Sequence, residues 1–324
     1  MMSKQEKHWI RPIGIPFTLT VLFSAILLTG FDLLGARQFS KELSFRASTL
    51  PDLSGLAWIT EDLFLAVHDA KNPEEIDLPR VSLLHLPRGL DGIRWESLKL
   101  KFPGQKSSDF ESAAAIPGTG QVLLVESTEE QNEKPFSRRI FLAELLRDGL
   151  KIVDVKEWPI KTKNVEGTAV ARIGERLVFI YAERAVGEEN TEIRFADVEL
   201  QPLKIGSFKN AGTFTSPDPT GENARPVSAM DVDSTGVVYV ASAEDPGDDN
   251  GPFRSAVYTI GVVTLKNGEP KVVLDHEPTQ LAVLDGLKVE SIAVREQPGK
   301  GLEIFVGLDD ENYGGTMRPI PLRP

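Results

Sequence analysis

Val289-Glu-Ser-Ile-Ala-Val294 is a short apolar stretch with an acidic second residue, and four earlier stretches repeat its pattern. They are Leu53-Ser-Gly-Leu-Ala-Trp58, Phe110-Glu-Ser-Ala-Ala-Ala115, Val165-Glu-Gly-Thr-Ala-Val170 and Val227-Ser-Ala-Met-Asp-Val232. Their second residues, Ser54, Glu111, Glu166, Ser228 and Glu290, follow one another at intervals of 57, 55, 62 and 62 residues. A period of this length is typical of propeller blades and not of shorter solenoid repeats. The pattern therefore predicts a ring of blades.

Each repeat continues in the same way after this first strand. A tight turn leads to a strongly apolar second strand, at 63–67, 122–125, 177–181, 237–241 and 302–307. Third strands follow longer polar loops, at 80–84, 139–142 and 255–260, and more polar fourth strands follow at 94–102, 151–158 and 271–275. We expect an all-β, five-bladed propeller of four-stranded antiparallel blades, with a short helix at 143–150 as the one departure.

The fifth repeat contains only three predicted strands, because the chain stops soon after residues 317–322. The stretch Gln38-Phe-Ser-Lys-Glu-Leu-Ser-Phe-Arg46 is strand-like and precedes the first repeat. We expect it to complete the last blade and close the ring, which would remove an unpaired sheet edge. A six-bladed ring with one degenerate blade is the alternative. In either case residues 37–324 form a single domain.

The amino terminus has the pattern of an export signal. Lys4, Lys7 and Arg11 precede twenty residues without a charge, whose densest apolar part is residues 17–28. That part is short for a membrane-spanning helix, which needs about 20 apolar residues. We expect residues 1–36 to be cleaved after Ala36, or to remain as a membrane anchor. The domain would then be periplasmic or secreted, and it would touch a membrane only if the segment is retained.

The composition excludes several classes of partner and metal site. The chain has a formal net charge of -12, and residues 37–324 alone carry -13. This charge repels phosphate backbones, so we expect no nucleic-acid partner. With no cysteine and four histidines, the chain cannot form a zinc site of the Cys/His type. Any metal should therefore have oxygen ligands. We also expect the protein to be a monomer.

Acidic residues are predicted to gather on one face of the ring. In a four-stranded meander the loops after the second strands lie on the face where the first strands begin, and these loops contain Asp69, Glu183 and Asp309. Glu111, Glu166 and Glu290 should lie near them, around the mouth of the central channel. Such a set of carboxylates suits Ca²⁺, which takes six to eight oxygen ligands. The alternative is that the glutamates pair with arginines that begin the third strands, namely Arg80, Arg139, Arg194, Arg254 and Arg318.

The chain resembles two propeller families in three features. They are the motif Ser54-Gly-Leu-Ala57, the apolar run that ends at Asp69, and the Glu-Gly or Glu-Ser starts at 111, 166 and 290. The two families are the SdiA-regulated family and the phytase-like family, also described as having the esterase-like activity of phytase. The resemblance extends over most of residues 38–324. It implies an exported, calcium-associated propeller, with phosphoester hydrolysis in some members, and it points to Asp69, Glu111, Glu166, Glu183 and Glu290. Ser228 departs from the glutamate pattern, and a phytase-like centre rich in lysine and aspartate is not recognisable.

Two functions are compatible with these residues. One is a non-catalytic exported propeller that binds a divalent cation, with a small anionic ligand or a protein partner at the acidic face. The other is a calcium-dependent hydrolase of phosphoesters or lactones. In that case Glu166 or His68 would activate water, and Arg80, Arg254 or Arg318 would hold the anionic substrate. A committed nucleophile is not recognisable, which favours binding.

Overall fold

The structure, a computed structural model, describes residues 50–69, 79–87, 92–107, 109–126, 138–147, 149–187, 190–248, 250–297, 299, 301–309 and 314–321. These residues belong to one compact unit, Thr49–Pro324. The predicted export segment 1–36 and the predicted closing strand 38–46 lie outside the described residues. In the described part no helix is long and apolar enough to cross a membrane.

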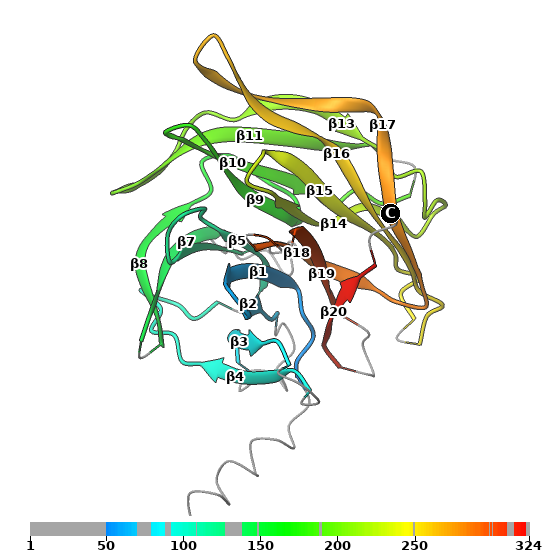
Figure 1. Ribbon diagram of the computed structural model, residues 1–324, viewed down its shortest axis with the longest axis horizontal. Coiled ribbons are helices and arrows are strands. Elements are labelled where there is room, and N and C mark those ends of the chain that lie inside the picture. Colours follow the sequence, from blue (N-terminus) through cyan, green and yellow to red (C-terminus); the bar gives the residue numbers. More distant parts are fainter. Residues whose placement is uncertain are drawn as a thin grey trace, which may run out of the picture. The chain divides into compact units, whose positions relative to one another are not determined.

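Within the described residues, twenty strands form five antiparallel sheets (Figure 1). The first sheet contains β1 (Gly55–Thr60), β2 (Leu63–Val67), β3 (Val81–His85) and β4 (Arg94–Leu98). The second contains β5 (Phe110–Ala115), β6 (Gln121–Glu126), β7 (Arg139–Leu146) and β8 (Gly149–Glu157). The third contains β9 (Val165–Ile173), β10 (Arg176–Glu183) and β11 (Thr191–Leu200), and β11 pairs with both β12 (Leu203–Ile205) and β13 (Lys209–Phe214). The fourth contains β14 (Ala224–Val232), β15 (Val237–Glu244), β16 (Arg254–Lys266) and β17 (Glu269–Asp285), and the fifth β18 (Val289–Gln297), β19 (Gly301–Leu308) and β20 (Thr316–Ile320).

The sheets are the blades of a five-bladed propeller, as predicted, and the six-bladed alternative is wrong. Figure 1 shows the first strand of each blade at the centre, with the later strands following outward. The first strands β1, β5, β9, β14 and β18 contact one another around the ring, and β18 contacts β1. Three strands of the fifth blade lie among the described residues. The predicted fourth strand, residues 38–46, lies outside them.

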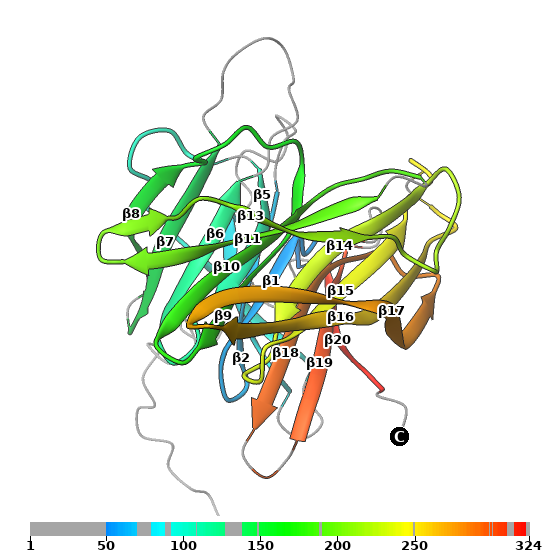
Figure 2. The same cartoon turned by 90° about the horizontal axis from the view of Figure 1, so that it is seen from above.

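Apolar side chains on both faces of each blade hold the ring together. β9 is buried over its first seven residues because its two faces pack against different blades. One face contributes Val165 and Val170 to a core shared with blade 2, and the other contributes Ala169 and Ala171 to a core shared with blade 4. This two-sided burial explains why the first strands have nearly continuous apolar sequences. Figure 2 shows the same blades after a turn of 90° from the view of Figure 1.

The expected helix at 143–150 is wrong. Ala143 pairs with Ile152, and Leu146 pairs with Gly149, so β7 and β8 form a hairpin at this point. Gly149 has a φ of 136°, a backbone conformation that favours glycine. Ala143, Leu145 and Leu150 contact the core between blades 1 and 2, whereas Leu146 is exposed.

Candidate functional site

The centre of the propeller is a narrow channel bounded by the first strands. Its polar lining residues are Ser54, Ser112, Glu166, Glu290 and Ser291, and the space between them is too narrow to enclose a water molecule. The acidic residues discussed below lie where the first strands begin or just after the second strands end. We call this end of the channel the channel mouth.

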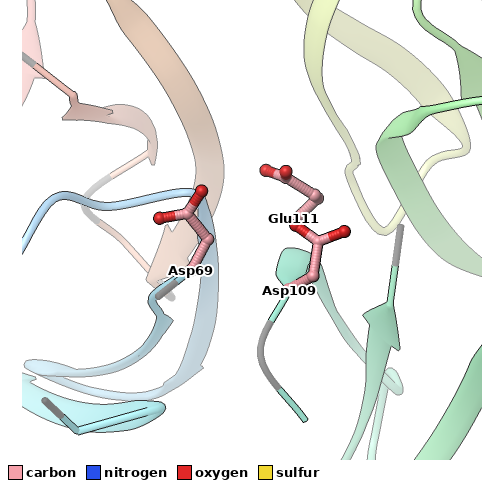
Figure 3. Close-up of side chains that lie close together, drawn as sticks. All are labelled: Asp69, Asp109 and Glu111. Atoms are coloured by element: carbon pink, nitrogen blue, oxygen red, sulfur yellow. The ribbon is translucent and has the colours of Figure 1, made fainter. Parts of the chain in front are cut away.

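Three carboxylates of blades 1 and 2 meet close to the channel mouth. Asp69 follows β2, Asp109 directly precedes β5, and Glu111 is the second residue of β5. Asp69 and Asp109 form an isolated antiparallel bridge, which brings the end of one blade beside the start of the next. One carboxylate oxygen from each of the three residues lies within 4.8 Å of the others (Figure 3). Asp109 is 2% exposed and Glu111 is 6% exposed. We call these residues the acidic trio.

The acidic trio suits a hard cation, because its donors are all carboxylate oxygens. Two of its members, Asp69 and Glu111, were candidates from the sequence. Asp109 was missed because it lies just before the repeated stretch that begins at Phe110. The sequence signal that could have identified it is an acidic residue two positions before Glu111, on the face where the first strands start.

Glu166 forms an ion pair inside the channel mouth. Its Oε1 lies 2.7 Å from Nε of Arg184, which follows β10 in the same blade. The Glu166 side chain is 2% exposed, whereas that of Arg184 is 19% exposed. The charge of the Glu166 carboxylate is therefore balanced by the guanidinium of Arg184, whose side chain is partly exposed to solvent.

Glu290 belongs to a larger network between blades 4 and 5. Nη1 of Arg225 donates to its Oε1 at 3.1 Å, and Nζ of Lys288 lies 3.7 Å from the same oxygen. Burial raises the pKa of Glu290 to about 7, although Arg225 and Lys288 act in the opposite direction. The negative charges of Glu166 and Asp309 add to the rise in pKa.

The same network includes two further carboxylates. Lys288 lies 3.0 Å from Oδ2 of Asp309 and 3.4 Å from Oδ2 of Asp245, and Arg225 also pairs with Asp245. Burial would raise the pKa of Asp245, but the charges of Arg225 and Lys288 outweigh it and lower the pKa. Asp309, a predicted metal ligand, therefore lies beside a lysine. Glu183, another predicted ligand, accepts a hydrogen bond from the backbone N–H of Lys163 at 2.8 Å.

His68 is wholly buried and both of its ring nitrogens have partners. Nδ1 lies 2.8 Å from the carbonyl oxygen of Asp52, which can only accept, so Nδ1 carries the proton. Nε2 lies 2.8 Å from Oγ of Ser82 and accepts the hydroxyl hydrogen. Burial lowers the pKa of His68 to about 4, and Arg80 adds to the decrease against the hydrogen bond to Asp52. The neutral ring thus connects the segment just before β1 to β3 through two hydrogen bonds.

The arginines predicted to hold an anion lie in three different environments. Arg80 is buried and donates from Nε to the carbonyl of Ser107 at 2.8 Å. Arg254 pairs with both carboxylate oxygens of Asp218, at 2.9 and 2.8 Å, and also with Asp285. Arg318 is exposed on β20.

For Glu166 and Glu290, the alternative of pairing with arginines that begin the third strands is corrected. Arg139 pairs with Glu126, and Arg194 pairs with Glu192. The partners of Glu166 and Glu290 are instead Arg184, Arg225 and Lys288. Arg184 follows β10, Arg225 lies near the start of β14, and Lys288 directly precedes β18. All three cations therefore lie at the channel mouth.

Comparisons with known proteins support the fold and leave the function open. No protein-family model matches the chain, and no curated protein matches it. A thermostable family-43 glycoside hydrolase has a TM-score of 0.52 and 12% identity, over 84% of this chain and 88% of that chain. A GH32 beta-fructofuranosidase from Bombyx mori has a TM-score of 0.47 and 10% identity, over 89% and 67%. A GH43 endo-arabinanase from Bacillus licheniformis has a TM-score of 0.46 and 11% identity, over 85% and 93%. At such identities the likeness concerns the fold alone.

Proposed function

We propose that the protein binds a divalent cation, with Ca²⁺ the first candidate, at Asp69, Asp109 and Glu111. The bound cation would hold a small anionic ligand or an acidic group of a protein partner at the channel mouth, without catalysing a reaction. The proximity of the three carboxylates carries this proposal, since their oxygens lie within 4.8 Å of one another and two of the residues are buried. In keeping with the amino-terminal pattern, we propose that the domain acts outside the cytoplasm.

The ligand chemistry follows from coordination and charge. If each of the three carboxylates supplies one oxygen, three or more of the six to eight positions of Ca²⁺ remain for water or for oxygens of a ligand. The chain carries a net charge of -12, which repels anions in the absence of a cation. Binding of an anionic ligand should therefore require the cation.

The buried histidine supports a binding role over a catalytic one. His68 has both ring nitrogens engaged and no exposed surface, and its partner Ser82 is equally buried. This pair is not placed to receive a substrate, although a base and a nucleophile of this kind need access to one.

A calcium-dependent hydrolase remains the second candidate, because Glu166 and Glu290 line the same channel. Two carboxylates in different environments can serve as a base and an acid. A screen of the full chain against aryl phosphoesters and lactones, with Ca²⁺ and with chelator, separates the two functions. Turnover that requires Ca²⁺ and is lost in Glu166→Gln would favour the hydrolase.

Calorimetric titration with CaCl₂ tests the cation site directly. The chelator-treated full chain should give a saturable heat, and at 100-fold excess over Kd the bound ion should stabilise the fold by about 2.7 kcal/mol. Asp109→Asn should remove both effects. Glu199→Gln, which removes one negative charge from an exposed pair with Lys204, should leave both unchanged. Absence of a saturable heat together with an unchanged melting temperature would refute the cation site.

A further inference from the structure

The acidic trio is assembled from two chain segments that belong to different blades. Asp69 follows β2 in blade 1, whereas Asp109 and Glu111 lie at the start of blade 2 (Figure 3). Carboxylates this close repel one another, so they would move apart unless other bonds held the two segments together. One such bond is the backbone bridge between Asp69 and Asp109.

Arg80 holds the backbone just before Asp109 from the side of blade 1. It directly precedes β3, and its Nε donates to the carbonyl oxygen of Ser107 at 2.8 Å. Arg80 is 4% exposed and Ser107 is 1% exposed, so this hydrogen bond is shielded from water. The backbone N–H of His68, the residue before Asp69, donates to the carbonyl oxygen of Arg80 at 3.1 Å. Arg80 is therefore bonded to both segments that carry the acidic trio.

Arg139 holds the same stretch of backbone from the side of blade 2. It is the first residue of β7, and its Nη1 donates to the carbonyl oxygen of Gln105 at 3.0 Å. Its Nε and Nη2 donate to the two carboxylate oxygens of Glu126 at 2.9 and 2.6 Å. The guanidinium also lies 4.7 Å from the ring centroid of Phe141. Gln105 is thus bonded to a side chain that its other contacts already fix in place.

We propose that Arg80 and Arg139 are positioning residues of the cation site, which hold Asp109 beside Asp69 so that a cation meets carboxylates already in place. This inference rests on the proposed function, because it concerns the same acidic trio. Neither arginine has to contact the cation, since each acts on a backbone carbonyl shortly before Asp109. A site ordered in advance binds more tightly, because less conformational entropy is lost on binding.

A positioning role is an alternative to the anion-holding role expected for Arg80 from the sequence. A guanidinium that holds a substrate has to be reached from the channel mouth, whereas Arg80 is buried and its Nε is engaged by Ser107. The carbonyl of Ser107 is a permanent partner within the chain.

Arginine-to-lysine substitution separates positioning from charge. Lysine keeps the positive charge but has one side-chain nitrogen, whereas Arg139 uses three nitrogens for two partners. Arg139→Lys should therefore keep an ion pair with Glu126 and lose the bond to Gln105. Arg176→Lys is the matched control, because Nε and Nη2 of Arg176 also pair with a single carboxylate, that of Asp197 in blade 3.

Calorimetric titration of the chelator-treated full chain with CaCl₂, at a temperature where each variant is folded, tests the proposal. Arg139→Lys should raise the Kd for Ca²⁺ about tenfold, which corresponds to about 1.4 kcal/mol, and Arg176→Lys should leave it unchanged. Melting curves in chelator provide a second readout. A purely structural arginine would lower the melting temperature and leave the Kd of the folded protein unchanged, and that result for Arg139→Lys would overturn the positioning role.

The same titration distinguishes failure of the positioning role from failure of the cation site. If the unmodified protein binds Ca²⁺ and Arg139→Lys binds it equally well, the cation site stands and the positioning role of Arg139 is wrong. If the unmodified protein gives no saturable heat, both proposals fail. Arg80→Lys is an independent test if Arg139→Lys does not fold, because it removes the Nε donor to Ser107. It should also raise the Kd about tenfold, and an unchanged Kd would contradict the proposal.

Discussion

Glu166→Gln tests whether the channel glutamates are held by arginines or by a metal. The substitution keeps the size of the side chain and removes the charge that faces Arg184 at 2.7 Å. Breaking a buried ion pair by removing one partner costs about 3–5 kcal/mol. Arg184 is 19% exposed and can recover part of its hydration, so we expect about 2–3 kcal/mol. Loss of the repulsion between Glu166 and Glu290 offsets a small part of this cost.

The assay is urea unfolding followed by tryptophan fluorescence, in chelator, with a double-mutant cycle that includes Arg184→Met. In a parallel thermal melt, we expect Glu166→Gln to lower the melting temperature by about 4–12 °C, since 1 kcal/mol corresponds to about 2–4 °C in a domain of this size class. The coupling free energy between the two positions should be about 2 kcal/mol. A coupling below about 0.5 kcal/mol would refute the ion-pair account. So would a loss of Ca²⁺ affinity in Glu166→Gln as large as that in Asp109→Asn.

Three further predictions concern pH and packing. Because the pKa of His68 is about 4, below the ordinary 6.5, its contribution to stability is complete above pH 6.5 and is lost as the pH falls towards 4. The melting temperature of His68→Gln should therefore lack the decrease that His68 causes between pH 6.5 and pH 4. Burial raises the pKa of Asp231 from 3.8 to about 7, so its contribution is complete below pH 4 and is lost as the pH rises to 7, with a slope of up to about 1.4 kcal/mol per pH unit. Asp231→Asn should flatten that decline, and an unchanged slope would exclude Asp231 as its source. Gly55→Ala should destabilise the fold by about 1–3 kcal/mol, because a Cβ at this position would lie 2.8 Å from the backbone N of Ala113. A lower urea midpoint would show this loss, and the control Gly92→Ala, where a Cβ meets open space, should leave the midpoint unchanged.

The fold could be predicted because the repeated residues are those that pack between blades. A first strand is buried on both faces, so the same apolar pattern has to recur in every blade, as it does in β9 and β18. The turns after the first strands were equally regular. The strands 139–142 and 151–158 were predicted, but β7 and β8 also include residues 143–146 and 149–150, which were interpreted as a short helix; Gly149 was the main local signal against it.

The partners of the site residues were harder to predict because they come from outside the repeated stretches. Arg225 lies at the start of β14, before the repeated part begins, and Lys288 directly precedes β18. Arg184 follows β10, at a loop that varies between blades. Periodicity identifies the positions that all blades share, whereas an ion pair needs complementary residues in only one blade or at one junction. Contacts of this kind depend on the folded geometry.

The two sides of the channel mouth differ in how their carboxylates are arranged, and this difference locates the expected cation. On the side of blades 3 to 5, Glu166, Glu290 and Asp309 each lie within 3.7 Å of a basic nitrogen. A cation that bound there would have to displace Arg184, Arg225 or Lys288, whose own charges would then be left close to it. On the side of blades 1 and 2, the acidic trio brings three carboxylate oxygens within 4.8 Å of one another. Because three carboxylate oxygens this close can contact one divalent ion together, we expect Asp109→Asn to lower the affinity for Ca²⁺.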